Sequence, residues 1–318
     1  MKQISVEQAA AFLERCEDAH ILIHRSPDGD CIGSGYSLQA VLRLLGKRSK
    51  VLCADPIPER FGFLLPKEPE EDFPPKCVIA VDVSDEKLFG SLEPDYAGKV
   101  DLCVDHHVSN LLYAGQVLLE PHAAAACEVL YKVYRAMGIQ FTKQIAMCLY
   151  TGMATDTGCF KFSCTRPETH IFTAEIMREF PDIRYDLINR SMFTVKSRAA
   201  LHAEMVMLSQ MEYHCNDRVT LIWATHDICQ ENGVDVKDME GISSLGLQPE
   251  GVEVGLTVRE PEPGVYKISM RSAKDVNVSE ICKKLGGGGH VKAAGCMMTD
   301  CTRDEVRERL LAAVEPAL

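Results

Sequence analysis

Residues 102–107 read Leu-Cys-Val-Asp-His-His, an apolar run that ends in one carboxylate and two imidazoles. Buried strands of parallel sheets are short apolar runs of this kind. Asp105, His106 and His107 follow the run directly, where packing alone gives no reason for two imidazoles and a carboxylate. In open α/β sheets, ligands bind just beyond the carboxyl ends of the strands. The stretch therefore predicts a strand of a parallel sheet with a ligand site at its end.

Acidic and histidine residues gather in the same way at three other places in the chain. Residues 21–30 read Ile-Leu-Ile-His-Arg-Ser-Pro-Asp-Gly-Asp, residues 78–82 read Val-Ile-Ala-Val-Asp, and Asp156 follows an expected helix. The ends of parallel strands converge in space, and carboxylates packed that closely repel one another unless a cation lies among them. The four clusters together predict a site for two divalent metals. The mixture of histidine and carboxylate favours Mn²⁺, Fe²⁺ or Zn²⁺ over Mg²⁺.

Each cluster has a simpler interpretation when it is taken alone. Asp28 and Asp30 flank a glycine after a proline, as in a plain turn on which His24 also lies. Asp82 would cap a helix, and Asp156 would mark the end of one. The joint occurrence of all four clusters in this order favours the metal site over these separate readings.

Length and composition point to a two-domain soluble protein. The chain has 318 residues, of which 46% are hydrophobic and 25% charged. Its first residues lack the basic and apolar segments of a signal peptide, and no apolar stretch approaches the roughly 20 residues that span a bilayer. The 14 cysteines include no Cys-x-x-Cys pair, which favours reduced thiols. We expect a cytoplasmic protein without a membrane partner.

The net charge of −12 argues against binding of a long nucleic-acid duplex, which needs clustered lysine and arginine. One segment has the opposite balance, because residues 265–295 hold six basic and two acidic side chains. This segment is therefore a candidate anion site. Its basic residues are Lys267, Arg271, Lys274, Lys283, Lys284 and Lys292.

Strands alternate with helices in the first half of the chain, as in a doubly wound, mainly parallel α/β sheet. We expect strands at residues 20–24, 51–54, 78–83 and 100–104, helices at 7–17, 33–45, 123–137 and 142–154, and mostly loop at 57–75. Helices at 167–179, 183–189 and 197–212 follow. Strands then return at 219–224, 252–258, 266–270 and near 294–298, with helices at 278–285 and 304–314. The sequence predicts an N-terminal domain at 1–192, a helical connector at 193–213 and a smaller α/β domain at 214–318, with a cleft between the domains.

The order of these clusters resembles the DHH phosphoesterases. The resemblance rests on His-x-x-x-Asp-x-Asp at residues 24–30, the strand ending in Asp82, Asp-His-His at 105–107, and the later Asp156. Residues 270–272, Met-Arg-Ser, and residues 286–295, Gly-Gly-Gly-Gly-His-Val-Lys-Ala-Ala-Gly, are similar to the signature of the DHH-associated C-terminal domain. The resemblance covers nearly the whole chain and is strongest for the short members, of the nanoRNase/pAp-phosphatase (NrnA-like) type.

The resemblance implies a role for each of these residues. One metal would be held by His24, Asp28 and Asp82, and the other by Asp30, Asp82, His106 and Asp156, with Asp82 bridging and Mn²⁺ as the ion. The catalytic residues would be Asp82, His107 facing the scissile phosphate, and Asp105 orienting its neighbours. The substrate-binding residues would be Arg271, Ser272, Gly287, Gly288, Gly289 and His290.

The function implied is hydrolysis of short oligoribonucleotides and linear dinucleotides such as pApA, extending to the 3′-phosphate of pAp. The attacking group would be a water activated by two metals. Three alternatives stay open: a cyclic dinucleotide phosphodiesterase, an inorganic pyrophosphatase, and a nucleotide sensor without turnover. A homodimer is compatible with the resemblance alone.

Overall fold

The computed structural model describes residues 2–67 and 71–318, apart from the side chains of residues 237, 238 and 240. The chain divides into two compact units, Met1–Val195 and Lys196–Leu318. Within the described ranges, no helix combines the length and the apolar character needed to cross a membrane.

The first unit is built on a six-stranded sheet in the order β1-β6-β5-β4-β2-β3. Every pairing between neighbouring strands of this sheet is parallel. The three central strands of this sheet are largely apolar and buried, as expected for a parallel sheet covered on both faces, whereas the edge strand at residues 2–3 is polar and exposed. The strands of the sheet are β1 (Lys2–Gln3), β2 (Ala19–Leu22), β3 (Ser49–Leu52), β4 (Cys77–Val81), β5 (Leu102–Asp105) and β6 (Gln116–Leu119).

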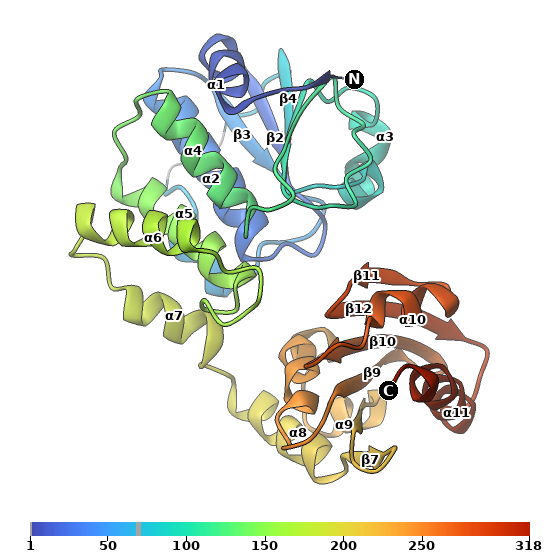
Figure 1. The fold of residues 1–318 in the computed structure, drawn as a ribbon. Helices are drawn as coiled ribbons and strands as arrows, with labels where there is room; N and C mark the ends of the chain where they lie inside the picture. The colour runs from blue at the N-terminus through green and yellow to red at the C-terminus, as the bar shows by residue number, and fades with distance from the viewer. Residues whose placement is uncertain (1, 68–70) are drawn as a thin grey trace. The chain divides into compact units, whose positions relative to one another are not determined.

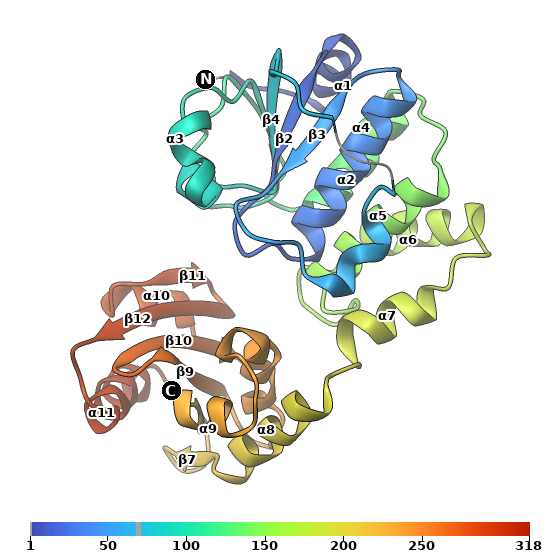
Figure 2. The ribbon, with the colours of Figure 1, turned by 180° about the vertical axis from the view of Figure 1, so that it is seen from behind.

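Helices and 3₁₀ turns cover the two faces of this sheet (Figures 1 and 2). One face packs into the large core with α1 (Val6–Arg15), α2 (Gly29–Leu44), α4 (Ala126–Ala136) and α5 (Lys143–Asp156). The other face lies under the 3₁₀ turn Glu86–Leu92 and the short α3 (Glu93–Tyr96). Two further helices, α6 (Pro167–Glu179) and α7 (Tyr185–Phe193), and a 3₁₀ turn at Glu59–Leu64 complete the unit. The predicted doubly wound α/β fold is confirmed.

Strand order brings the predicted clusters to one end of the sheet. The neighbours β5, β4 and β2 are parallel, so their carboxyl ends lie at the same edge. His24 follows β2, Asp82 follows β4 directly, and Asp105 ends β5. Asp82 has a left-handed φ of +58°, an uncommon conformation for a residue other than glycine and one found often at functional sites.

The start of α2 differs from the prediction, which placed Asp28 and Asp30 together in a turn and began the helix at Gly33. Asp28 is the N-cap, and its Oδ1 accepts hydrogen bonds of 3.1 Å from the backbone N–H groups of Asp30 and Cys31. Asp30 and Cys31 therefore lie in the first helical turn. The capping carboxylate satisfies donors that the helix leaves open, which starts the helix four residues earlier than periodicity indicates.

The second unit is a smaller α/β unit with a mixed six-stranded sheet in the order β11-β12-β10-β9-β8-β7, as predicted in class. Only the β8–β9 pair is parallel. Its strands are β7 (Glu212–His214), β8 (Val219–Ala224), β9 (Val254–Glu262), β10 (Val265–Ser272), β11 (Gly288–His290) and β12 (Ala293–Thr299). Its helices are α8 (Arg198–Ser209), α9 (His226–Glu231), α10 (Val278–Lys284) and α11 (Arg303–Val314), with 3₁₀ turns at Val236–Leu247 and Glu315–Ala317.

The boundary between the two compact units lies between Val195 and Lys196, inside the expected connector at 193–213. Ala203 and Met207 of α8 are buried in one cluster with Ile222 of β8, so α8 packs as part of the second unit. Four strands of two to four residues were not predicted from the sequence: β1, β6, β7 and β11. Part of the predicted loop at 57–75 is the 3₁₀ turn at Glu59–Leu64, and residues 68–70 of it lie outside the described ranges.

Candidate metal centre

Potential ligand atoms of His24, Asp28 and Asp82 meet at the ends of β2 and β4. The Nε2 atom of His24 lies 3.7 Å from Asp28 Oδ1 and 3.7 Å from Asp82 Oδ2. Two atoms that share one divalent ion at about 2.1 Å each lie about 3–4 Å apart. These three side chains therefore have the spacing of a common ligand set, and Cys31 belongs to the same group of candidate metal-binding residues.

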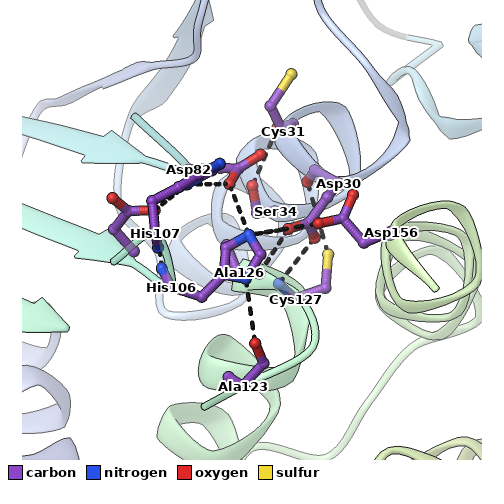
Figure 3. Close-up of polar contacts among 12 residues, drawn as sticks. Asp30, Cys31, Ser34, Asp82, His106, His107, Ala123, Ala126, Cys127 and Asp156 are labelled. Carbon is purple, nitrogen blue, oxygen red and sulfur yellow. Dashed lines mark hydrogen bonds and ion pairs between the residues drawn. The ribbon is translucent and has the colours of Figure 1, made fainter. Parts of the chain in front are cut away.

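A second group is formed by Asp30, His106 and Asp156, which come from α2, the segment after β5 and the end of α5. The Nε2 atom of His106 lies 3.3 Å from Asp156 Oδ2 and 3.9 Å from Asp30 Oδ2. Figure 3 shows the imidazole of His106 directed at these two carboxylates. The structure thus brings together predicted residues that are more than 120 positions apart in the chain.

Asp82 lies between the two groups. Its Oδ2 faces His24, while its Oδ1 lies 3.5 Å from His106 Nε2 and 3.5 Å from His107 Nδ1. Asp82 Oδ1 and His106 Nε2 are both buried and have no hydrogen-bond partner within the described part of the chain. Buried polar atoms rarely lack a hydrogen-bond partner, which indicates that each of these two atoms binds a further group. A bridging role for Asp82 is compatible with this position.

Ionisation in the group around His106 indicates missing positive charge. Burial, followed by the nearby Asp30 and Asp28 carboxylates, raises the pKa of Asp156 well above its usual range. Burial and the Asp82 carboxylate raise the pKa of Asp30 to about 7. Burial opposes protonation of His106, but its carboxylate neighbours, Asp82 foremost, bring its pKa to about 11. These shifts arise because the carboxylates are packed together without enough positive charge between them, so the donor set fits a divalent metal ion.

Backbone carbonyls fix the orientation of two histidines. His24 Nδ1 lies 2.8 Å from Arg25 O, and His106 Nδ1 lies 3.1 Å from Ala123 O. A carbonyl oxygen only accepts, so each Nδ1 carries the proton and donates it. When either imidazole is neutral, its lone pair is therefore on Nε2, the atom that faces the carboxylates. Metal-ligating histidines usually make this outer hydrogen bond.

Asp105 orients the two histidines that follow it through hydrogen bonds. Its Oδ1 accepts hydrogen bonds from the backbone N–H groups of His106 (2.8 Å) and His107 (3.2 Å) and from His107 Nδ1 (2.8 Å). Its Oδ2 accepts a 2.6 Å hydrogen bond from Asn110 Nδ2. Asp105 is therefore occupied by its neighbours, in the orienting position that the resemblance implies.

Asp30 is held by the start of α4. Its Oδ2 accepts a 2.5 Å hydrogen bond from Ala126 N, and its Oδ1 a 2.9 Å hydrogen bond from Cys127 N (Figure 3). Gly152 of α5 lies against the same carboxylate, since a Cβ atom there would be 2.6 Å from Asp30 Oδ1. The close packing of α2, α4 and α5 therefore determines the position of the Asp30 carboxylate.

The predicted substrate-binding residues lie at one edge of the second sheet. Arg271 of β10 is in register with Ala293 of β12, and Ala293 is in register with His290 of β11. Residues in register share a face of the sheet, so Arg271 and His290 flank the small side chain of Ala293. Ser272 is buried, and its hydroxyl donates to Lys274 O over 3.3 Å.

The glycine run is part of a strand pair rather than a flexible linker. Gly288 and Gly289 belong to β11 and pair with Gly295 and Ala294 of β12. Gly289 has a φ of +140°, and a Cβ there would lie 2.6 Å from Ala294 Cα. A Cβ at Gly287 would lie 2.1 Å from Gly295 O. The close approach of the two strands therefore requires glycine.

Sequence reasoning missed two residues of the centre, Cys31 and Asn110. The cysteine pattern predicts only reduced thiols, and Cys31 carries no local signal beyond its place after Asp30. Asn110 contacts Asp105 only because residues 107–112 turn back under β5, with Asn110 N bonded to His107 O. The sequence shows the amide but not that turn.

Comparison with known proteins identifies the two units. The chain matches the N-terminal domain of the DHH family over residues 19–153 and the DHHA1 domain over residues 219–318. It is 32% identical to the bifunctional oligoribonuclease and PAP phosphatase NrnA of Thermus thermophilus, over 94% of this chain and 90% of that protein. The bifunctional oligoribonuclease and PAP phosphatase NrnA of Mycoplasma genitalium is 25% identical over 94% of each chain.

Solved structures share the fold. An exopolyphosphatase-related protein from Bacteroides fragilis superposes with a TM-score of 0.88 at 22% identity, over 98% of this chain and 95% of that one. RecJ of Thermus thermophilus, determined with Mn²⁺, has a TM-score of 0.58 at 14% identity, over 96% of this chain and 54% of RecJ. With both domains matched in order and a relative above 30% identity along nearly its full length, the chain belongs to the DHH family of phosphoesterases.

Proposed function

We propose that the protein is a metal-dependent phosphoesterase that hydrolyses short oligoribonucleotides and the 3′-phosphate of pAp. The observation that carries the proposal is the pair of ligand groups that meet at Asp82, each with donor atoms 3.3–3.9 Å apart. The relatives that match along most of their length are named as oligoribonucleases and PAP phosphatases. The acidic net charge of −12 favours a short substrate over a long one.

The residues assigned to metal are those of the two groups. One ion would be held by His24, Asp28 and Asp82, and a second by Asp30, His106 and Asp156 with Asp82 shared. Two neighbouring divalent ions would supply charge neutralisation at a phosphoryl group and a water of lowered pKa as nucleophile. Mn²⁺ is the proposed ion, because the donors mix imidazole with carboxylate.

His107 is the residue proposed to act on the phosphoryl group. Asp105 holds its Nδ1 at 2.8 Å, and its side chain is 30% exposed while Asp105 is fully buried. The Asp105 carboxylate and Asp82 raise the pKa of His107 against the opposing effect of burial. A protonated imidazole in this position donates a hydrogen bond to a phosphoryl oxygen and can pass a proton to the departing oxygen.

The row Arg271–Ala293–His290 is the proposed grip on the rest of the substrate. Neighbouring strands are about 4.8 Å apart, so the Cα atoms of Arg271 and His290 are about 10 Å apart across the row. Two long donor side chains at that spacing can converge on one terminal phosphate. Arg271 adds a permanent positive charge that pairs well with phosphate oxygens.

Steady-state kinetics of variants test this grip. We expect Arg271→Ala and His290→Ala to raise KM for a 5′-phosphorylated dinucleotide while Mn²⁺ affinity is unchanged. Lys283→Ala is the matched control, since Lys283 is an exposed basic residue of α10 in the same segment. An unchanged KM in both Arg271→Ala and His290→Ala would remove the second unit from substrate binding.

A substrate panel tests the function itself. The protein with Mn²⁺ is incubated separately with pApA, a short RNA, a long RNA, pAp, cyclic di-AMP and pyrophosphate. We expect turnover of pApA, the short RNA and pAp to exceed that of the long RNA. Turnover of pyrophosphate alone, or of none of the panel, would overturn the proposal. Preference for cyclic di-AMP would instead favour the activity named for PdeA of Listeria monocytogenes, a 22% identical relative about half of which this chain covers.

A further inference from the structure

The ligand group around His24 contains a sulfur atom. The Sγ atom of Cys31 and the donor atoms of His24, Asp28 and Asp82 all lie within 4.8 Å of one another. Cys31 is fully buried. It is also the only cysteine in any candidate metal-binding group of the described residues, although the chain has 14 cysteines.

The fold explains how consecutive residues serve different groups. Asp30 and Cys31 lie in the first turn of α2, where successive side chains project about 100° apart. Asp30 is turned towards α4 and His106, whereas the Cys31 thiol points away from the Asp30 and Asp156 carboxylates (Figure 3). The thiol contacts Asp28 O over 3.6 Å, which places it on the side of the His24 group.

The donor atoms around the thiol are arranged as in a cation site. His24 donates its Nδ1–H to Arg25 O, so its Nε2 is the ring atom that faces Asp28 Oδ1 and Asp82 Oδ2, at 3.7 Å each. One ring nitrogen and two carboxylate oxygens thus converge beside the thiol. Asp82 is 2% exposed as a residue, and its Oδ1, which faces His106 of the other group, has no hydrogen-bond partner among the described residues. A cation is a partner that a ring nitrogen, two carboxylate oxygens and a sulfur can share.

We propose that Cys31 is a thiolate ligand of the ion held by His24, Asp28 and Asp82. The inference rests on the proposed function, because it takes that group to be a metal position. On binding, the thiol releases its proton to solvent and the sulfur bonds the ion. The position then offers one nitrogen, two carboxylates and one sulfur, whereas the Asp30, His106 and Asp156 position offers nitrogen and oxygen only.

This difference makes the two positions unequal in metal preference. Thiolate ligands favour Zn²⁺, Co²⁺ and Fe²⁺, while carboxylate and imidazole without sulfur leave Mn²⁺ competitive. The His24 position therefore selects a softer ion than the His106 position. Metal-depleted protein offered both ions should take up Zn²⁺ first at the His24 position and Mn²⁺ at the other.

Spectroscopy tests the sulfur bond without an activity measurement. Metal-depleted protein is titrated with Co²⁺, and thiolate ligation gives intense near-ultraviolet charge-transfer absorption that imidazole and carboxylate ligands lack. We expect this absorption in the wild-type protein and its loss in both Cys31→Ser and Cys31→Ala. Cys127→Ser is the matched control, because Cys127 is equally buried and its Sγ lies 3.7 Å from Asp30 O, beside the other group. Its absorption should equal that of the wild type.

Two further measurements test the sulfur bond, and the first uses only wild-type protein, so its outcome does not depend on how the variants fold. X-ray absorption of wild-type protein with one equivalent of Zn²⁺ should show a sulfur neighbour at about 2.3 Å. Competition calorimetry should show the Zn²⁺-over-Mn²⁺ preference falling by roughly 10-fold or more in Cys31→Ser, the range seen when metal-site partners are removed. A zinc spectrum without sulfur, or Co²⁺ absorption that persists in both Cys31 variants, would overturn the proposal.

Failure of this inference and failure of the proposed function are distinguishable. If the wild-type protein hydrolyses pApA but its zinc spectrum lacks sulfur, Cys31 is not a ligand and the phosphoesterase assignment stands. If the spectrum contains sulfur but no phosphoester is hydrolysed, the thiolate ligand stands and the assigned activity falls.

Discussion

The side-chain amide nitrogen of Asn110 lies 2.6 Å from Oδ2 of Asp105 and donates a hydrogen bond to it. The other oxygen, Oδ1, holds the backbone N–H of His106 and the Nδ1 atom of His107, both at 2.8 Å. Asp105 is fully buried, so water cannot replace a lost partner. Asn110 is thereby the positioning residue for the carboxylate that orients both histidines.

Replacing Asn110 with leucine should impair catalysis through Asp105. The change leaves a buried carboxylate oxygen without a donor, at a cost of about 1–3 kcal/mol in the free energy of unfolding. Outer partners of metal ligands are typically worth about 10–100-fold, and we expect a fall in kcat of that order. Urea unfolding and steady-state kinetics with Mn²⁺ measure the two effects.

Asn189→Leu is the control for a purely structural loss. Asn189 donates a 2.8 Å hydrogen bond to Tyr150 in the same unit, between α7 and α5. This variant should lose stability with little change in kcat. If Asn110→Leu behaves in the same way, Asn110 supports the fold and not the orientation of His107.

Replacing Asp82 with asparagine should weaken metal binding at both positions. Asp82 Oδ2 faces His24 Nε2 at 3.7 Å and Oδ1 faces His106 Nε2 at 3.5 Å, so one residue belongs to both of the proposed ligand sets. Calorimetry with Mn²⁺ should find two ions per wild-type chain and an affinity loss of roughly 10-fold or more at each position in the variant. Asp85→Asn, which removes a nearby N-cap carboxylate, should bind as the wild type does. Normal affinity at either position would contradict the bridging role.

The sequence predicts the sheet and most of the centre because both depend on local patterns. Apolar runs mark β2, β4 and β5, and the residues that follow them meet because parallel neighbours end at one edge. The start of α2 was missed since the Asp28 cap overrides the turn signal of Pro27 and Gly29. Short strands such as β6 have too few residues for a periodic signal.

Contacts formed by distant segments were beyond sequence reasoning. The pattern around Cys31 is that of an ordinary buried cysteine, and only the convergence of β2 and β4 places His24 and Asp82 beside it. The strand pairing of Gly288 and Gly289 is likewise invisible in a run of identical glycines. Which partner a residue meets depends on packing, which a single sequence does not display.

Replacing Gly152 of α5 with alanine should displace the Asp30 carboxylate. The added Cβ would lie 2.3 Å from Cys127 Sγ and 2.6 Å from Asp30 Oδ1, so α5 must move outward or the carboxylate must turn. Overpacking of this kind costs about 1–3 kcal/mol in the free energy of unfolding. We expect a lower thermal midpoint and weaker Mn²⁺ binding at the His106 position.

Gly62→Ala is the matched control for this substitution. Gly62 has nothing within 4 Å of an added Cβ and does not have a left-handed φ. Its stability and metal binding should stay at wild-type levels. If Gly152→Ala binds Mn²⁺ normally at both positions, close packing of α5 does not set the place of Asp30.

Replacing Asp156 with asparagine should have opposite effects with and without metal. Burial and the neighbouring Asp30 and Asp28 carboxylates raise the pKa of Asp156, so its ionisation is easier in the unfolded chain than in the folded one. Its contribution to stability is therefore full below the unfolded pKa and is lost as the pH rises through the folded pKa. In EDTA at a pH above that range, the neutral asparagine should raise the urea midpoint. In Mn²⁺ at about 100 times its Kd, the wild-type protein gains about 2.7 kcal/mol per site and the variant gains less.

A stability change of opposite sign in EDTA and in Mn²⁺ distinguishes a metal ligand from a carboxylate with a purely structural role. Asp182→Asn is the control, because Asp182 is an exposed partner of Lys143 at 2.7 Å and its pKa is lowered by that lysine. It should shift stability by the same small amount in EDTA and in Mn²⁺. If Asp156→Asn also shifts stability equally in both solutions, Asp156 does not bind metal, and the His106 position must be completed by another residue.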